Sequence, residues 1–248
     1  MKLACWLLSV PASVSGQLDS SRHTVSLATY IGLQPPAKVT DQSGSSCDIH
    51  PLPSVSFGAD VSYRYFFDPG RRHAVGGIVQ LGWFTPKVDV WVPSDTTGSG
   101  PDNGAIGYRM SWGLIGLVRS WKLCYSSRVP LWSRNTLMTT ASVGLSEMTT
   151  TFAFGPIISD TTYIGSVDME FASGSSTISY QLGLGISILR DLGPGHSLML
   201  GLDLTLSEPG ISGGYSIFPG TDRECTGRFI GSFSKAALQV GYVWRIGR

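Results

Sequence analysis

The residues best suited to acid–base or nucleophilic chemistry are few and lie far apart in the sequence. The chain contains four histidines: His23, His50, His73 and His196. Hydrolysis or acyl transfer needs a nucleophile held beside such a base. Ser197 follows His196, but serine is too frequent in this chain for the adjacency to carry meaning, and no spacing links a glutamate to a histidine. The sequence therefore predicts no catalytic residues.

Cofactor, metal and nucleic-acid sites are not indicated either. No two cysteines have zinc-site spacing, and Gly183-Leu184-Gly185 lies inside an apolar–polar alternation, where glycine allows close packing rather than phosphate binding. The formal net charge is +1, from 18 Lys and Arg against 17 Asp and Glu. Nucleic-acid binders instead gather basic charge in a patch or stripe. We expect no cofactor, no metal and no nucleic-acid partner.

Six charged residues stand on the polar side of alternating segments: Asp60, Arg64, Arg109, Asp203, Lys235 and Arg245. Charges that face an enclosed interior must pair, because an unpaired buried charge is costly. If the segments on either side of residues 207–231 pair in register about that connection, Asp203 lies opposite Lys235. Such a pair would be a salt bridge, or one step of a proton or ion path.

Alternation of apolar and polar residues with a period of two places these charges on β-strands. The pattern is clearest in residues 54–67, 175–189 and 198–206, where large apolar side chains alternate with Ser, Gly, Gln, Thr and Asp. Five further strands are predicted at 24–33, 74–92, 105–123, 136–154 and 232–246. Two of these change parity, near Thr85-Pro86 and near Val118-Arg119, which indicates β-bulges or the point where a strand leaves a membrane.

The connections between these strands alternate in length. Residues 68–72 and 191–195 are tight turns punctuated by Pro and Gly, and 124–135 is the third connection on the same side. Longer segments rich in Gly, Ser, Asp and Pro lie opposite, at 34–53, 93–104, 155–174 and 207–231. Short turns on one rim and long loops on the other are typical of transmembrane β-barrels, whose termini and short turns face the periplasm.

The N-terminus has the order of a secretory signal: Met1-Lys2, an apolar run to Val10 and small residues to Gly16. A buried N-terminal strand is the alternative. No other run approaches the roughly 18 apolar residues of a membrane-spanning helix. We expect a signal peptide at 1–16, followed at 17–248 by either a soluble exported domain or a closed barrel.

The composition of the two strand faces decides between these possibilities. The smaller face carries Gly, Ser, Thr, Gln and a few charges, which is too polar for the dry core of a soluble barrel, so the apolar face must meet lipid. Tyr63, Tyr65, Tyr242 and Trp244 fall towards strand ends, where such rings prefer the membrane interface. The prediction is an all-β fold, an eight-stranded antiparallel up-and-down transmembrane β-barrel.

The last strand carries a family resemblance. Gln239, Gly241, Trp244 and Ile246 resemble the C-terminal β-signal through which the barrel-assembly machinery recognises outer-membrane barrels. The terminal Phe common in proteobacterial members is replaced here by Ile246-Gly247-Arg248. The chain therefore resembles the outer-membrane β-barrel proteins of Bacteroidota, which include porin-family and PorT-like members, and small OmpA-like barrels. The resemblance implies the outer membrane of a Gram-negative bacterium, with lipopolysaccharide and lipid as surroundings.

Two cysteines fall in predicted long loops that flank the first and last strands, Cys47 and Cys225. These strands become neighbours when the barrel closes, so a disulfide between them is plausible in an oxidising compartment. Free or differently paired thiols are the alternative.

Three classes of function follow. The first is a non-enzymatic structural or protein-interaction role, as an accessory subunit of a secretion or envelope-assembly complex with outer-membrane or periplasmic partners. The second is a conduit for small solutes or hydrophobic ligands. The third is a lipid-A-modifying hydrolase or acyltransferase, which we do not expect because the chain has no catalytic constellation.

Overall fold

The computed structural model describes residues 22–43, 48–85, 87–93, 107–132, 134–158, 167–168, 178–217 and 225–246. The predicted signal peptide at 1–16 and the predicted disulfide partner Cys47 lie outside these ranges. Within them, no helix is long and apolar enough to cross a membrane.

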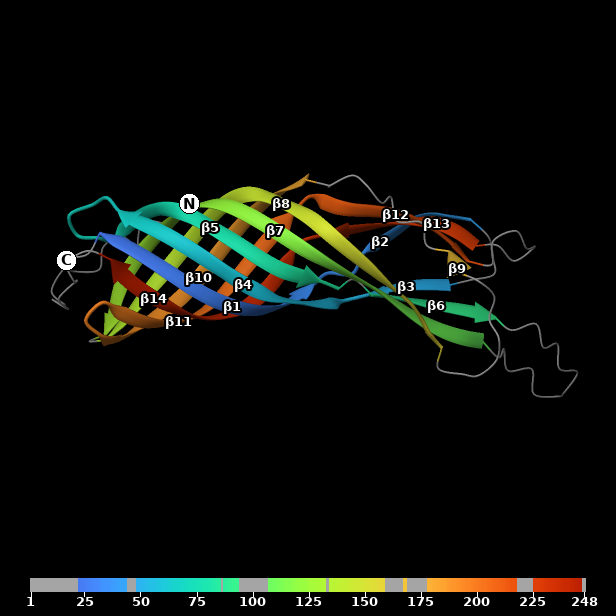
Figure 1. Ribbon diagram of the computed structural model, residues 1–248, viewed down its shortest axis with the longest axis horizontal. Helices are drawn as coiled ribbons and strands as arrows, with labels where there is room; N and C mark the ends of the chain where they lie inside the picture. The colour runs from blue at the N-terminus through green and yellow to red at the C-terminus, as the bar shows by residue number, and fades with distance from the viewer. Residues whose placement is uncertain are drawn as a thin grey trace, which may run out of the picture.

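The alternating segments close into a barrel (Figure 1). Its strands are β1 (His23–Gln34), β4 (Ser54–Phe66), β5 (His73–Phe84), β7 (Gly107–Trp132), β8 (Asn135–Ile158), β10 (Ile178–Gly193), β11 (His196–Ser207) and β14 (Lys235–Ile246). Each pairs with the next barrel strand along the chain, and β14 returns to β1, with Gly241 opposite Ala28. Every pairing is antiparallel. The predicted eight-stranded up-and-down barrel is confirmed.

The barrel carries its apolar face outwards. Along β7, Leu123 is 72% exposed whereas Ser126 on the opposite face is 0% exposed. The same inversion holds along β10 and β11, where every second residue is an exposed Leu or Ile. Exposed apolar surface that runs around the barrel far exceeds the patches of soluble monomers. It suits contact with hydrocarbon, because all strand edges of the barrel are paired.

Strands continue past one end of the barrel, which we call the outer end. There β3 (Asp48–Leu52) and β6 (Lys87–Pro93) pair with each other, and β6 also pairs with β7. A separate four-stranded sheet, called the outer sheet below, contains β2 (Lys38–Ser43), β13 (Cys225–Ser232), β12 (Pro209–Ile217) and β9 (Val167–Asp168). Both extend away from the barrel in Figure 1.

These outer strands correct the prediction of long loops at 34–53 and 207–231. Their sequences are rich in Gly, Ser and Pro and do not alternate, as in β12, because the outer strands lie beyond the apolar band and need no continuous apolar face. Backbone pairing forms them instead. The alternation of apolar and polar residues that predicts membrane strands therefore does not detect these outer strands.

The opposite end, called the short-turn end, contains the turns β4–β5, β7–β8 and β10–β11. The turn at 68–72 is as predicted. The turn predicted at 191–195 is shorter, because β10 runs on to Gly193 and residues 194–195 alone form the turn. The predicted connection at 124–135 is wrong, because β7 runs on to Trp132 and the chain turns at Arg134. Its inward residues are Ser126 and Arg128, and such polar lumen residues resemble a loop in the sequence.

Both predicted irregularities are present. The register between β7 and β8 shifts between Leu117 and Val118. The chain also breaks between β5, which ends at Phe84, and β6, which begins at Lys87, although both pair with β7. The second break marks where the chain passes from the barrel to its outer extension.

Candidate functional site

Three of the charged residues that the sequence predicted on the inner face, Asp60, Arg64 and Asp203, line one cavity in the lumen. Asp60 on β4 and Asp203 on β11 both border this cavity of about 30 Å³, together with Lys122 on β7. Gln239 Nε2 donates a hydrogen bond to Asp60 Oδ2 at 3.4 Å. These groups are held by strands on different sides of the barrel, so the network braces the lumen across its width.

A relay of hydrogen bonds joins Lys122 to Asp203. Lys122 Nζ donates to Thr205 Oγ1 at 3.1 Å, and Thr205 Oγ1 donates to Asp203 Oδ2 at 2.9 Å. Lys122 is 5% exposed and Thr205 is 0% exposed, so the charge and its relay are removed from water. Hydrogen bonds to charged groups are strong in such surroundings.

Arg64 is bonded by serines rather than by a carboxylate. Its Nε donates to Ser126 Oγ at 3.1 Å, and its Nη1 donates to Ser26 Oγ at 3.3 Å and to Ser62 Oγ at 2.5 Å. The three serines come from three strands, β7, β1 and β4. Arg64 thus connects three strands through hydrogen bonds inside the lumen.

Lys235 makes different contacts from those predicted. Its Nζ donates to Gln80 Oε1 at 3.0 Å and lies 3.7 Å from the centroid of the Tyr30 ring. The strand register places Lys235 opposite Thr205, and Asp203 opposite Ala237. The predicted facing pair of Asp203 and Lys235 is therefore wrong by two residues. The prediction placed the two strands symmetrically about residues 207–231, whereas the observed pairs are offset from that arrangement by two residues.

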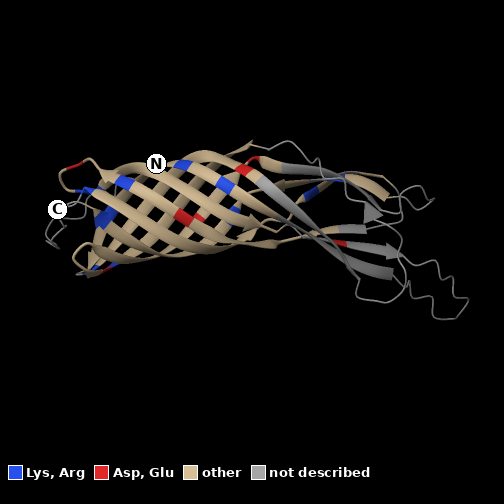
Figure 2. Ribbon diagram, viewed as in Figure 1, with Lys and Arg blue, Asp and Glu red and all other residues tan. Residues whose placement is uncertain are grey.

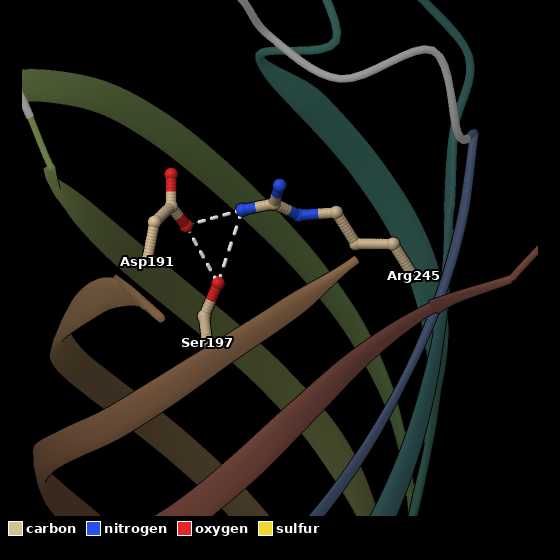
Figure 3. Close-up of polar contacts among 3 residues, drawn as sticks. All are labelled: Asp191, Ser197 and Arg245. Carbon is tan, nitrogen blue, oxygen red and sulfur yellow. Dashed lines mark hydrogen bonds and ion pairs between the residues drawn. The ribbon is translucent and has the colours of Figure 1, made fainter. Parts of the chain in front are cut away.

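Arg245 closes the lumen at the short-turn end (Figure 3). Its guanidinium forms an ion pair with Asp191, and Nη2 lies 3.0 Å from Ser197 Oγ. Ser197 Oγ also donates to Asp191 Oδ1 at 2.7 Å. The triad links the last strand, β14, to the β10–β11 hairpin. Nearby, the guanidinium of Arg128 lies 3.9 Å above the Phe66 ring.

Apolar layers stand on both sides of the charged middle. At the outer end, Phe84, Val118 and Phe233 form a buried cluster. Towards the short-turn end lies a second cluster, made of Ala28, Met138, Leu189, Met199 and Val243. A cavity of about 20 Å³ lies next to the outer cluster and is bordered by Tyr30, Gln80 and Lys235. This cavity and the one beside Asp60 have room for only one or two waters each.

Five of the six predicted lumen charges face the interior: Asp60, Arg64, Asp203, Lys235 and Arg245. The side chain of Arg109 lies outside the part that the structure describes. Three charged residues of the lumen were missed: Lys122, Arg128 and Asp191. Lys122 lies within the predicted strand 105–123, on the same face as Ser120, and was not recognised as a lumen charge. Arg128 lies beyond the predicted end of that strand, on the same face as Ser126. Asp191 was assigned to a turn.

Three of the four histidines lie at the short-turn end. His23, His73 and His196 begin β1, β5 and β11 at the short-turn end, and His50 lies on the outer strand β3. His23 Nδ1 is 2.7 Å from Tyr63 Oη, and His73 Nδ1 is 2.6 Å from Tyr125 Oη. Within the described ranges, no group of three or more His, Cys, Asp or Glu is arranged to hold a metal ion.

The cysteines and the last strand have clear structural surroundings. Cys225 is buried and disulfide-bonded, and Cys124 is a buried free thiol. Among the predicted assembly-signal residues, Gln239 bonds Asp60, and a Cβ at Gly241 would lie 2.6 Å from the Ala28 Cβ. Trp244 packs on Tyr242 with 4.8 Å between centroids, and Ile246 is exposed. The role of these residues in assembly stays a prediction.

Neither a protein-family model nor a curated protein matches the sequence. Solved structures do match it in shape. OprG from Pseudomonas aeruginosa, an outer membrane protein, is 11% identical with a TM-score of 0.52, over 93% of this chain and 98% of that one. Neisserial surface protein A is 11% identical with a TM-score of 0.38, over 90% and 97%. Ail of Yersinia pestis is 9% identical with a TM-score of 0.32, over 90% and 99%.

These likenesses bear on the fold and lend no support to a Bacteroidota or PorT-like relationship in particular. The OprG match covers nearly the whole of both chains. This chain has the closed, eight-stranded fold of a small outer-membrane β-barrel protein.

Proposed function

We propose that this chain is an integral outer-membrane protein of a Gram-negative bacterium with a structural or protein-interaction role. Its short-turn end faces the periplasm, and its outer strands project from the cell. The observation that supports this role most directly is that side chains fill the lumen while strands continue beyond the barrel. A protein built in this way offers surfaces for partners, which suits an accessory subunit of a secretion or envelope-assembly complex.

The ends of the outer sheets support this role. In the described part of the chain, β3 ends one sheet, and β2 and β9 end the outer sheet. A strand with one paired edge can accept a strand from a partner through backbone hydrogen bonds. Barrel strands lack such edges because the barrel is closed, so binding of this type would be confined to the outer end.

Cross-linking in native membranes tests the proposal. The wild-type protein is compared with a variant in which residues 209–232 are replaced by a short turn. Folding of both is checked by the mobility shift of unheated barrels in gels. We expect discrete cross-linked complexes for the wild type and their loss in the variant. Complexes that persist in the variant, or monomer alone from both, would contradict an interaction role for the outer sheet.

A conduit is the second candidate, because few side chains close the outer end of the lumen. Phe84, Val118 and Phe233 form that closure, and small cavities lie behind it. Conductance across proteoliposomes separates the two functions. Background conductance supports the interaction role, whereas selective permeation by the wild type supports the conduit.

We assign no enzymatic role. In the described part of the chain, the histidines of the short-turn end pack against aromatic rings, and Ser197 bonds Asp191 rather than a histidine. An unchanged lipid-A mass spectrum after overexpression would agree with this assignment. A new acylation or deacylation product would overturn it.

A further inference from the structure

Four exposed arginines lie at or near the short-turn end. Arg72 lies in the β4–β5 turn, Arg134 in the β7–β8 turn and Arg190 at the end of β10, while Arg22 immediately precedes β1. Because these elements follow one another around the barrel, the four arginines are spread along its rim. Figure 2 shows Lys and Arg gathered at this end.

Backbone hydrogen bonds fix these positions relative to one another. Arg22 O accepts a bond from Phe66 N at 2.8 Å, and Arg72 O accepts one from Arg128 N at 2.7 Å. Arg134 O accepts a bond from Asp191 N at 2.8 Å. Arg22, Arg72 and Arg134 are therefore held by backbone hydrogen bonds to a neighbouring strand, and Arg190 is held within β10, where it pairs with Asn135 of β8. The four residues, Arg22, Arg72, Arg134 and Arg190, are called the arginine belt below.

The acidic groups at this end are occupied elsewhere. Asp68 accepts hydrogen bonds from the backbone N–H groups of Arg72 and His73, at 2.9 and 2.7 Å. Asp191 is bonded by Arg245 and Ser197. These are the two acidic residues among the described residues of the short turns. Asp68 lies in the same turn as Arg72, so among the described residues of this end the four belt arginines stand against two carboxylates, and positive charge is in excess.

A ring of exposed aromatic side chains lies next to the belt on the outer surface. Tyr63, Phe67 and Tyr125 are each nearly half exposed, and each lies beside a histidine ring or bonds to one. Such rings favour the headgroup level of a bilayer. Arg190 has the outward parity of Ile188, two residues away, so it follows directly on the apolar band. The belt is thus placed at the depth of lipid phosphates.

We propose that the arginine belt binds the phosphodiester groups of anionic phospholipids. A guanidinium pairs with phosphate oxygens through two parallel hydrogen bonds, which an ammonium cannot do. The proposed occupant is a diacyl phospholipid with net negative charge, in the leaflet that meets the short turns. The inference rests on the proposed membrane insertion and orientation. If the orientation were reversed, the phosphates of lipid A would take the place of the phospholipid.

Native mass spectrometry of the refolded full chain tests the belt. The protein is released from detergent micelles containing equal amounts of phosphatidylglycerol, phosphatidylcholine and lipid A, and the retained lipids are counted. The variant combines Arg72→Gln, Arg134→Gln and Arg190→Gln. Arg119→Gln and Arg228→Gln, at exposed positions away from the belt, are the matched controls. A second variant with Lys at the three belt positions separates charge from bidentate bonding.

We expect the wild type and both controls to retain phosphatidylglycerol preferentially. The Gln variant should lose this preference, by about fivefold in affinity for each arginine that reaches a phosphate, and the Lys variant should lose part of it. Equal retention of phosphatidylglycerol by the wild type and the Gln variant would refute lipid binding by the arginine belt. Tighter retention of lipid A than of phosphatidylglycerol, lost on the same substitutions, would overturn the phospholipid assignment. Failure to insert, seen as a missing gel-mobility shift in the wild type, would instead refute the proposed membrane function.

Discussion

Phe233 packs edge-on against Phe84 at the outer end of the lumen, with 5.5 Å between ring centroids and 78° between ring planes. Phe84 ends barrel strand β5, whereas Phe233 lies in the bend between outer strand β13 and barrel strand β14. Gly210, at the start of β12, packs on the same ring, since a Cβ there would lie 2.3 Å from Phe233 Cε2. The residue that closes the lumen is therefore also the joint between the barrel and the outer sheet.

Replacement of Phe233 by Ala should open the lumen from outside. The native thiol of Cys124 lies inside the barrel and is 5% exposed, so it reports on access without an added probe. We expect a small, membrane-impermeant thiol reagent added from the outer side to label Cys124 faster in Phe233→Ala than in the wild type. The lost packing should also lower the free energy of unfolding by about 3 kcal/mol.

Phe57→Ala is the matched control, because Phe57 is 49% exposed on the lipid-facing surface. It removes an aromatic side chain without touching the closure, so the labelling rate of Cys124 should not change. Equal labelling of Phe233→Ala and the wild type would mean that other side chains seal the outer end.

The sequence predicted the barrel well because lipid imposes a rule on every membrane strand. Outward residues must be apolar, so β4 and β11 could be located to within two residues at each end, whereas β10 lies at 178–193 rather than at the predicted 175–189. It could not predict the partners of the lumen charges. The register of β11 and β14 differs by two residues from the predicted one, and the Gly- and Pro-rich segment between these strands has no alternation from which the register could be read. Lys235 meets Gln80 and Tyr30 instead of Asp203.

Asp203→Asn should destabilise the barrel through Lys122. The substitution removes the charge at the end of the relay through Thr205, which leaves a buried ammonium with weaker compensation. We expect a loss of about 3 kcal/mol in the free energy of unfolding, measured by urea titration of the folded barrel in lipid vesicles. Lys122→Met in the same chain should restore most of it, with a coupling energy of about 1–3 kcal/mol. Additive effects of the two substitutions would refute the relay.

Cys225 is expected to pair with Cys47. Cys225 is disulfide-bonded, and the strand that it begins, β13, pairs with β2, where Ser43 Oγ lies 2.5 Å from Thr226 Oγ1. Cys47 lies four residues beyond Ser43 in the sequence. Peptide mapping without reduction should therefore yield a cross-linked Cys47–Cys225 peptide, and Cys124 should remain alkylatable after denaturation. A Cys225 peptide joined to any other cysteine would refute the pairing.

The β4–β5 turn should stabilise the barrel in a pH-dependent way through Asp68. Burial opposes ionisation, but hydrogen bonds from the backbone N–H groups of Arg72 and His73 outweigh it and lower the pKa of Asp68. A lowered pKa contributes stability above the pKa of the unfolded chain, and this contribution is lost as the pH falls through the folded pKa. Asp68→Asn should thus be less stable than the wild type at pH 7, and the difference should shrink below about pH 4. A difference that stays constant down to pH 2.5 would rule out the charge as its origin.

Gly82→Ala should disturb the lumen through the Tyr30 ring. An added Cβ at Gly82 would lie 1.8 Å from the hydroxyl oxygen of Tyr30 and 3.0 Å from its Cζ, so the ring must move. Since the Lys235 ammonium rests on that ring, the shift would also weaken this contact and the hydrogen bond to Gln80. We expect a loss of about 1–3 kcal/mol in the free energy of unfolding. Gly77→Ala is the control on β5, because its Cβ would meet nothing closer than a backbone oxygen of Lys122 at 3.8 Å. Equal stability of Gly82→Ala and Gly77→Ala in urea would show that the close approach of the Tyr30 ring to Gly82 does not contribute to stability.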